Sequence, residues 1–429
     1  MVNIQTLPDE VLLKIFNNLP QFDKFYNVPL VSKRFLKISR DPKLAKSLSL
    51  KYINEFIFED VKKMLDRYKW LQELSLDYCF KLTSQILCYA LRTNQKLTSI
   101  RIGTNEYSGF GCPPCQEELK INPCDFKDHG KNIKDLAICN IEIEESKIMD
   151  ILCLNLKSLR LDTVVYEPKY LDVLTKSSEF LEAIDITTLC GVEVDSLKSF
   201  FTAKMHTLKK LTICDLYDDT EIVEKLRTIE CLYNLEELVL DGYMPSDSYN
   251  SLVKIPNLKV LHITDKSSYE TGYKISLLYH RLNINQLEEL KLSFAKTFRN
   301  DSEYDAINFF CHKPSFHNNI FPNIQRLELD DGYNLITEDQ IFTLVRNCPN
   351  LKYLVLDFYE FKFINDEILA KLIHHFGIDI EIKNFSWMKK RINKYLRSFS
   401  SRASSKNEFD IYMHNFPNLN NPHQKSFSE

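Results

Sequence analysis

Hydrophobic residues recur along most of the chain in a six-residue pattern, with Leu or Ile at its first, fourth and sixth positions. The first clear copy is Leu71-Gln-Glu-Leu74-Ser-Leu76. Eleven copies begin at Leu71, Leu97, Ile133, Leu156, Leu181, Leu208, Leu235, Leu258, Leu287, Ile324 and Leu351. Eight of the ten intervals between them are 23 to 29 residues long. A period of this length indicates a stack of similar units and argues against fragments of amphipathic helices as the source of the pattern.

Each copy predicts a short strand whose last two apolar side chains point inward. One repeat cannot bury that apolar face alone, whereas stacked repeats bury a continuous core, so the strands are expected to form a parallel sheet with helices as crossovers. Helical patterns follow Thr83 or Ser84, Thr337 and Asn365. Ala45, Leu48 and Leu50 predict a degenerate first strand, and Gly377-Ile-Asp-Ile-Glu-Ile382 predicts a closing strand.

The first 40 residues follow a helical pattern instead. Apolar residues at Val11, Leu12, Ile15, Phe16 and Leu19 predict one helix, with Thr6 and Asp9 in capping-box spacing. A second set with helical spacing consists of Val28, Val31, Phe35 and Ile38, and Pro29 is expected in the first turn of a helix. A segment this short forms only a small core and cannot bury the whole apolar stripe within itself. The stripe therefore predicts contact with a partner. The alternative is a helical cap on the stack of repeats.

Two segments resemble a known family. The run from Leu7 to Leu19, LPDEVLLKIFNNL, and the run from Leu30 to Phe35, LVSKRF, resemble the F-box. The segment that begins Cys348-Pro-Asn-Leu351 resembles the cysteine-containing leucine-rich repeats of F-box proteins. The resemblance implies docking to a Skp-type adaptor, and through it to a cullin and a RING subunit. The residues that it implies for the adaptor contact, or for holding the helices of the interface, are Leu7, Pro8, Ile15, Phe16, Leu19 and Val31.

The expected fold class is therefore α/β. A helical F-box over residues 1–44 precedes a leucine-rich-repeat solenoid over residues 45–383, a horseshoe with short parallel strands on its concave face and helices on its convex face. Insertions are expected near residues 104–132 and 294–323. Residues 384–400 predict a basic amphipathic helix, which would serve as a cap on the last repeat, as a signal for nuclear import or contact for a partner, or as a contact for an anionic membrane. Residues 401–429 predict a disordered tail.

Composition and charge narrow the function. The 429 residues carry a net charge of −4, which gives no global positive field and argues against nucleic acid as a partner. The sequence shows no signal peptide and no long apolar span, which argues against a membrane location. Twelve cysteines in such a chain are expected to be reduced thiols, which favours a cytoplasmic or nuclear location.

The expected concave face is acidic. Eleven acidic and five basic residues occupy the 33 positions that flank and separate the last two apolar residues of each copy. An acidic trough would favour a basic segment of a protein substrate, although solvated charge on a strand end is the simpler reading. The candidate substrate-binding residues are Glu73, Asp77, Asp162, Asp185, Glu237, Asp241, Glu328, Asp330, Tyr353 and Asp357.

Other chemistry has weaker signals. Cys112, Cys115, Cys124 and His129 could hold zinc, although their spacing matches no named motif and free thiols in a loop explain them as well. Nucleotide-binding, metalloprotease and nucleophile-elbow motifs are absent from the sequence. No catalytic residue and no cofactor is therefore predicted.

Three functions follow as expectations. The first is the substrate-recognition subunit of an SCF-type ubiquitin ligase, in which catalysis belongs to partner subunits. The second is a scaffold or assembly factor that binds an adaptor without ubiquitin-ligase output. The third is an enzyme that uses a metal in the 104–132 insertion.

Overall fold

The computed structural model describes most of the N-terminal two thirds of the chain and several later segments. The described residues are 4–19, 23–41, 43–44, 46–51, 58–77, 83–103, 126, 129–139, 143, 145–162, 164, 166–216, 221–252, 254–266, 286–294, 321–330, 338–357 and 378–382. The chain divides into two compact units, Met1–Asp215 and Leu216–Glu429. The predicted basic helix at 384–400, the tail at 401–429 and the helix after Asn365 lie outside the described residues.

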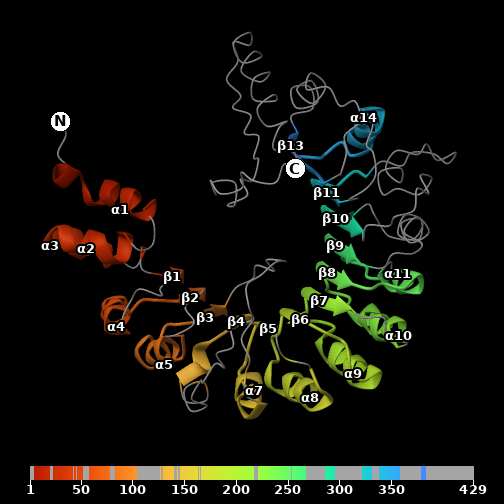
Figure 1. The fold of residues 1–429 in the computed structure, drawn as a ribbon, viewed down its shortest axis with the longest axis horizontal. Coiled ribbons are helices and arrows are strands. Elements are labelled where there is room, and N and C mark those ends of the chain that lie inside the picture. The colour runs from red at the N-terminus through yellow and green to blue at the C-terminus, as the bar shows by residue number, and fades with distance from the viewer. Residues whose placement is uncertain are drawn as a thin grey trace, which may run out of the picture. The chain divides into compact units, whose positions relative to one another are not determined.

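The first unit begins with a module of short helices (Figure 1). Its elements are η1 (Ile4–Thr6), α1 (Asp9–Asn17), η2 (Asp23–Asn27), α2 (Val28–Val31) and α3 (Lys33–Ser39). The core of the module consists of Leu12, Phe16, Val28, Phe35, Ile38 and Leu44. The rings of Phe16 and Phe35 meet edge to face at a centroid distance of 5.0 Å. This core is small, as expected for a segment of this length.

One sequence-based expectation for this module is wrong in detail. Helix α1 begins after Pro8, which precedes its first residue. The second apolar set forms two helices, because Ser32 is extended with φ −162° and ψ 162° between α2 and α3. The Ser32 hydroxyl instead accepts a hydrogen bond from the Phe35 N–H at 3.1 Å and starts α3. Pro29 lies in the first turn of α2, as predicted.

Repeats fill the rest of the first unit. Their described elements are β1 (Ser47–Lys51), α4 (Phe58–Arg67), β2 (Glu73–Asp77), α5 (Thr83–Thr93), β3 (Ser99–Gly103), η4 (Gly130–Asn132), β4 (Asp135–Cys139), α7 (Glu145–Leu152), β5 (Ser158–Leu161), α8 (Pro168–Ser177), β6 (Ala183–Ile186), α9 (Val194–Lys204) and β7 (Lys210–Leu216). Strands β1 to β7 pair in chain order, and each pair is parallel.

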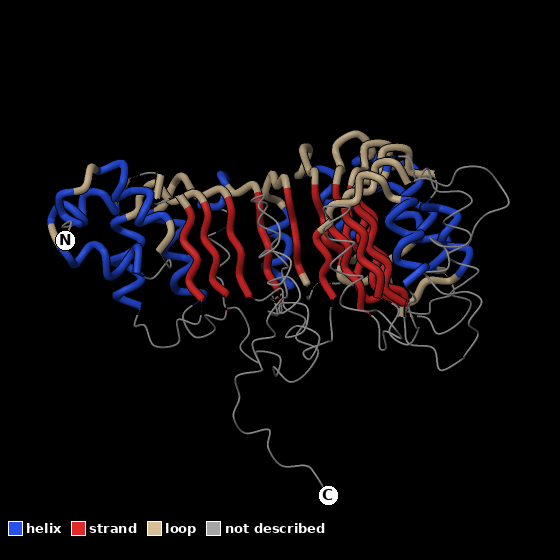
Figure 2. Tube along the Cα trace, turned by 90° about the horizontal axis from the view of Figure 1, so that it is seen from above, coloured by secondary structure: helices blue, strands red, loops and turns tan. Residues whose placement is uncertain are grey.

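The second unit repeats the same arrangement. Its described elements are α10 (Ile222–Arg227), η5 (Thr228–Cys231), β8 (Glu237–Gly242), η6 (Ser246–Ser248), α11 (Tyr249–Leu252), β9 (Val260–Asp265), β10 (Glu289–Phe294), β11 (Arg326–Asp330), α14 (Glu338–Asn347), β12 (Tyr353–Asp357) and β13 (Asp379–Ile382). Strands β8 to β13 again pair in parallel and in chain order. In each unit the strands form one layer and the helices cover one face of it (Figure 2).

The repeat pattern accounts for the core. In all eleven predicted copies the last two apolar residues lie on a strand and are buried, as Leu74 and Leu76 are in β2. The strand register pairs equivalent positions, so that Leu74 faces Leu48 on one side and Ile100 on the other. The degenerate first strand and the closing strand are confirmed as β1 and β13. The leucine-rich-repeat fold predicted from the sequence is therefore confirmed within each unit.

Polar side chains join the helix ends of neighbouring repeats. The buried Asn94 amide, after α5, donates to the carbonyl of Tyr68 at 3.0 Å, just past α4. The Ser178 hydroxyl donates to the carbonyl of Leu154 at 2.9 Å, and the Lys204 ammonium to that of Ser178 at 2.7 Å. Burial lowers the pKa of Lys204. Since the last carbonyls of a helix lack partners within it, each of these side chains completes the helix end of the preceding repeat.

Charged side chains alternate along the edge where the chain enters β5, β6 and β7. The Glu182 carboxylate lies 3.4 Å from the Lys157 ammonium and 3.3 Å from that of Lys209. Burial acts to raise the pKa of Glu182, but the hydrogen bonds from Lys209 and Lys157 outweigh it and hold that pKa below its ordinary value.

No described helix is long and apolar enough to cross a membrane.

We expect Glu182→Gln to reduce stability in a pH-dependent way. Because folding lowers the pKa of Glu182, its stabilisation is present above the unfolded-state pKa of about 4.3 and is lost as the pH falls through the folded-state value. The free energy of unfolding in urea should therefore be lower in the variant at about pH 7 and converge on that of the native protein at about pH 3. A difference that stays constant over this range would contradict the prediction.

Candidate functional site

Exposed apolar side chains are concentrated in the N-terminal helical module. Among the described residues, eight large hydrophobic side chains are exposed, and four of them belong to this module: Ile4, Val11, Leu30 and Val31. Within the module the largest exposed fractions are 66% for Leu30 and 58% for Val31. The other four, Trp70, Phe180, Tyr233 and Tyr353, are spread over both units. So many exposed apolar side chains in a small module indicate an interaction surface.

Local structure explains why these side chains point outward. Helix α2 is a single turn, in which Val28 and Pro29 face the core and Leu30 and Val31 do not. The chain then turns at Ser32, which allows α3 to bury Phe35 and Ile38. In α1, Leu12 and Phe16 are buried one turn apart, which leaves Val11 at the edge of the buried stripe and 39% exposed.

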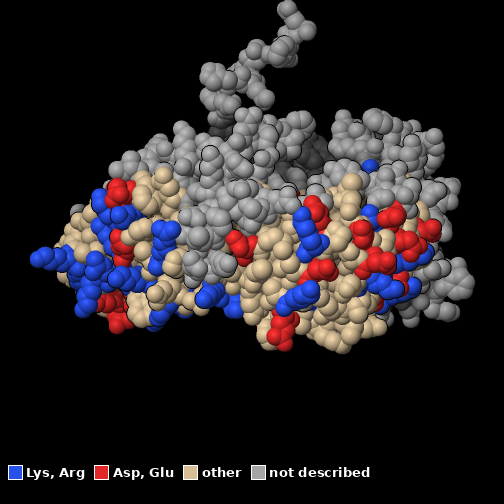
Figure 3. Space-filling model, turned by 90° about the horizontal axis from the view of Figure 1, so that it is seen from below, with Lys and Arg blue, Asp and Glu red and all other residues tan. Residues whose placement is uncertain are grey.

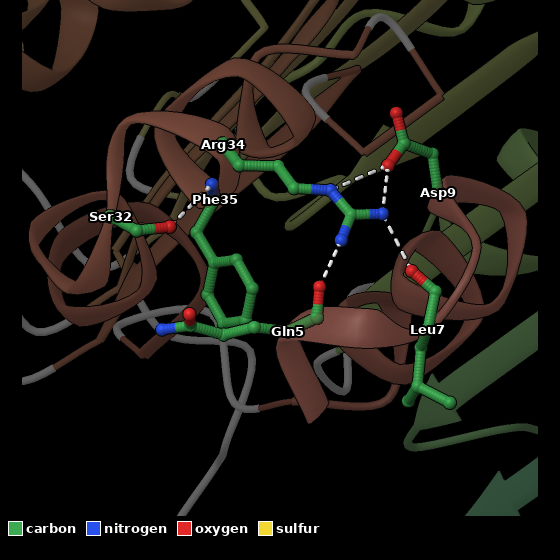
Figure 4. A network of polar contacts seen from close by, with 6 residues as sticks. All are labelled: Gln5, Leu7, Asp9, Ser32, Arg34 and Phe35. Atoms are coloured by element: carbon green, nitrogen blue, oxygen red, sulfur yellow. Dashed lines mark hydrogen bonds and ion pairs between the residues drawn. The ribbon is translucent and has the colours of Figure 1, made fainter. Parts of the chain in front are cut away.

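A network around Arg34 fastens the N-terminal segment to α3 (Figure 4). The Arg34 guanidinium donates to the Asp9 carboxylate from Nε at 3.0 Å and also from Nη2. Nη2 donates to the Leu7 carbonyl at 2.6 Å, and Nη1 donates to the carbonyl of Gln5. The planar, multidentate guanidinium thus orients η1, which carries Ile4, the turn at Leu7, and the first turn of α1, which carries Val11.

The structure places the six predicted adaptor residues in different environments. Phe16 is 1% exposed, so it holds the helices together and presents no surface. Leu7, Ile15 and Leu19 are half-buried against the core, whereas Pro8 and Val31 are exposed. Leu30 and Val11 are exposed as well, although they are not among the predicted adaptor residues. The run Val28-Pro-Leu-Val31 was the available signal, since one helical turn cannot bury four consecutive residues against one core.

We expect Arg34→Lys to loosen the N-terminal segment. Lysine keeps the charge and can pair with Asp9, but it lacks the fork that reaches the carbonyls of Gln5 and Leu7 as well. The free energy of unfolding should fall by about 1–2 kcal/mol, less than for a buried charged network because Arg34 is partly exposed. Hydrogen exchange of the amides of residues 7 to 12 should become faster, and unchanged exchange there would contradict the role of the network.

A second candidate site is the open face of the sheet, the face opposite the helices. In the first unit, Arg160 lies between two predicted substrate-binding residues. Its guanidinium Nε is 2.6 Å from Asp162 Oδ1, and its Nη1 is 3.4 Å from Asp185 Oδ2. Glu73 is exposed, and the Asp77 side chain lies outside the described residues. Part of the negative charge of this face is therefore neutralised within the protein.

The open face of the second unit carries a linked set of charges. His262 Nε2 and Glu289 Oε1 lie 3.0 Å apart, and the same carboxylate oxygen is 3.5 Å from the Arg326 Nε. Lys291 Nζ is 2.9 Å from Glu328 Oε1, and the Lys266 ammonium is 2.7 Å from Asp241.

Two further polar contacts on this face involve a hydroxyl and an aromatic ring. The Ser293 hydroxyl donates to Asp330 at 2.8 Å, and the Arg326 guanidinium lies 6.0 Å from the centroid of the exposed Tyr353 ring. Glu237 is half-buried, and the Asp357 side chain lies outside the described residues. Acidic groups outnumber basic ones on this face, but strand-to-strand pairing binds several of them.

The predicted zinc ligands are not brought together in what the structure describes. Cys112, Cys115 and Cys124 lie outside the described residues, and His129 is exposed. Among the described residues, no group of three or more Cys, His, Asp or Glu side chains could hold a metal ion. The described Cys139 is buried, which raises its pKa to about 12 and leaves it a neutral thiol.

Comparison with known proteins identifies the helical module. Residues 4–51 match the F-box-like family model. The chain is similar in structure to the crystal structure of the Rad7 and Elc1 complex in yeast, with 18% identity, a TM-score of 0.47 and 88% of each chain covered. It is also similar to the leucine-rich repeat-containing protein LegL7 from Legionella pneumophila, with 14% identity, a TM-score of 0.43, and 77% of this chain and 97% of that chain covered. No curated protein sequence matches the chain.

Proposed function

We propose that this protein is a non-catalytic receptor subunit whose F-box docks a Skp-type adaptor and whose repeats bind a protein substrate. The observation that carries the proposal is the coincidence of two independent features in one module. Residues 4–51 match the F-box-like model, and the same segment exposes Ile4, Val11, Leu30 and Val31. A free-standing cap on the repeats would have no use for exposed Leu30 and Val31 side chains.

In the proposed mechanism the F-box supplies the connection and the sheet supplies the recognition. Docking buries Leu30 and Val31 against the adaptor, which links the chain to a cullin and a RING subunit. A basic segment of the substrate contacts the open face of the sheet, where acidic groups such as Glu237, Asp241 and Asp330 lie. The complex then raises the local concentration of substrate lysines beside the ubiquitin-carrying subunit, and the chemistry belongs to the partners.

The adaptor contact is tested by co-purification of the full chain with a Skp-type adaptor. The docking variant is Leu30→Asp/Val31→Asp, which places charges on two exposed residues and spares the core. The matched control is Phe180→Asp, which changes a side chain that is 60% exposed in the turn before β6. We expect the native chain and the control to bind, and the docking variant, still folded by circular dichroism, to bind at least about tenfold more weakly. Equal binding by the docking variant would overturn the adaptor proposal.

Ubiquitin output is tested separately. The adaptor complex is combined with a cullin, a RING subunit and a ubiquitin-charged conjugating enzyme, and proteins captured by the repeats are examined for ubiquitin. Modification that depends on Leu30 and Val31 supports the ligase receptor. Stable capture of an adaptor and a partner without modification would identify the chain as an adaptor-bound scaffold.

A further inference from the structure

Basic side chains gather where the helical module meets the first repeats. We call the set Arg40, Lys43, Lys46, Arg67, Lys69 and Lys96 the basic edge. Arg67 is half-buried, and the other five side chains are exposed. Figure 3 shows many Lys and Arg side chains, with fewer Asp and Glu among them, over the N-terminal end of the first unit, at the left of the view. This local positive charge contrasts with the net charge of −4 for the chain.

The strand register brings members of the basic edge together. Strand β1 pairs with β2 so that Ser47 faces Glu73, which puts Lys43 and Lys69 at equivalent places in adjacent repeats. The pairing of Glu73 with Ser99 relates Trp70 to Lys96 in the same way. The Lys46 carbonyl accepts hydrogen bonds from the N–H groups of Gln72 and Glu73 at 2.8 and 3.0 Å. Neighbouring strands lie about 5 Å apart, so Lys43, Lys69 and Lys96 follow one another along the turns before β1, β2 and β3.

Tyr68 links the end of α3 to the end of α4. Burial raises the pKa of Tyr68, whereas a hydrogen bond with Ser39 and the positive charges of Arg67 and Arg40 act in the opposite direction. Both cationic groups are therefore close to one buried phenol. Arg40 of the helical module thus lies on the same side of the first unit as Arg67 of the repeats.

Carboxylates do not neutralise the basic edge. Among the described residues, no carboxylate forms an ion pair with any of its six side chains. Of the nearest acids in sequence, Asp41 accepts a hydrogen bond from the Lys43 backbone N–H at 2.8 Å, and Asp66 accepts one from the Tyr89 hydroxyl at 2.6 Å. The lysines that enter β5, β7 and β9 are by contrast paired with Glu182 and Glu236.

An exposed indole lies within the basic edge. Trp70 is 48% exposed, next to Lys69, and the Lys96 ammonium lies 3.5 Å from the centroid of its ring. Sites for single-stranded nucleic acid combine two elements. Cations follow the phosphates, and an aromatic ring stacks on a base. The basic edge offers both, because its cations form no ion pairs with described carboxylates and Trp70 is exposed among them. An acidic polypeptide would use the cations but not the indole.

We propose that the basic edge and Trp70 form a binding site for single-stranded nucleic acid. The site belongs to the first unit alone and does not depend on the proposed adaptor contact, because it shares no residue with Leu30 and Val31. The sequence argument against nucleic acid rested on total charge, which averages this row with acidic residues elsewhere in the chain. Sequence preference is expected to be weak, since phosphates and ring stacking carry the contact.

The test measures binding of a labelled oligothymidine of about 20 nucleotides to the full chain by fluorescence anisotropy. The variant Lys43→Glu/Lys69→Glu reverses two charges of the basic edge. The control Lys176→Glu/Lys198→Glu reverses two exposed lysines on α8 and α9 of the same unit. We expect the basic-edge variant to bind at least about tenfold more weakly and the control to bind as the native protein does. Native affinity should fall about 300-fold between about 50 and 200 mM salt if six phosphates are contacted.

A second measurement reports on stacking. In a Trp387→Phe background, Trp70 is the one remaining tryptophan, and its emission should be quenched when the oligonucleotide binds. Polyglutamate serves as the competing polyanion. Equal oligonucleotide binding by the charge-reversed variant would overturn the proposal. Unchanged Trp70 emission, with polyglutamate competing at equal charge concentration, would also overturn it in favour of an acidic protein partner.

Discussion

Replacing Phe16 with alanine is expected to unfold the N-terminal module and to abolish adaptor binding with it. Phe16 is 1% exposed, and its ring packs edge to face on Phe35 in a core of six buried residues. Truncation of a buried phenylalanine costs about 3–5 kcal/mol through lost burial and the cavity left behind. A module of this size has little further core with which to compensate, so the loss should exceed its own stability.

The measurement is hydrogen exchange resolved by peptide, with the repeats as an internal reference. Amides of α1 and α3 should lose protection in Phe16→Ala, while those of β5 to β7 keep it. The matched control is Val31→Ala, which truncates a side chain that is 58% exposed and should change stability by no more than about 0.5 kcal/mol. Retained protection of α1 in the Phe16 variant would show that the module does not depend on this core.

The second large effect is expected at the end of β3, where Gly103→Ala should disrupt the pairing of β3 with β4. Gly103 has φ +84°, a backbone conformation that L residues rarely adopt, and a Cβ built there would lie 1.8 Å from the carbonyl oxygen of Cys139. The obstacle is backbone of a paired strand, so it cannot be relieved by a rotamer change. We expect the free energy of unfolding to fall by more than about 4 kcal/mol, the range of severe single substitutions.

Gly191→Ala separates the clash from the backbone strain. Gly191 has a similar φ of +73°, but nothing lies within 4 Å of its Cβ position. Its cost should therefore be the conformational strain alone, about 1–2 kcal/mol. Urea unfolding of the two variants gives both values under the same conditions. Similar losses for Gly103 and Gly191 would show that the close approach of β3 to β4 is relieved by movement of the strands.

The hydrophobic pattern was sufficient to predict the repeat fold, because the same physical constraint recurs in every repeat. Each strand must bury two side chains against helices on one side, as β8 does with Leu238 and Leu240. The spacing therefore predicts both where a strand lies and which of its side chains point toward the helices. The break at Ser32 could not be read from spacing, since Val28, Val31, Phe35 and Ile38 fit one helix as well as two. The break is decided by a capping hydrogen bond that the Ser32 hydroxyl accepts from the Phe35 N–H. This bond competes locally with continuation of the helix.

The candidate sites were predicted unevenly for a similar reason. Family resemblance supplies which residues belong to the F-box motif, but it does not separate Phe16, inside the core, from Val31, outside it. On the open face of the sheet, charge could be counted from the sequence. Which acid meets which base depends on register and side-chain reach, as in the contacts of Arg160 with Asp162 and Asp185.

The side chains that complete helix ends also give the repeat array a direction. Asn94, Ser178 and Lys204 each donate to a carbonyl of the repeat before them. The amides of Asn132, Asn257 and Asn350 do the same at the turns before the strands, donating to the carbonyls of Gln95, Tyr233 and Pro322 at 2.8, 2.7 and 2.6 Å. The carbonyls of Tyr68, Leu154 and Ser178 also accept a backbone hydrogen bond from their own repeat, so the next repeat supplies a second donor. A chain that ends between two repeats therefore loses these side-chain donors at its last helix end, and each repeat is held more firmly once its successor has folded.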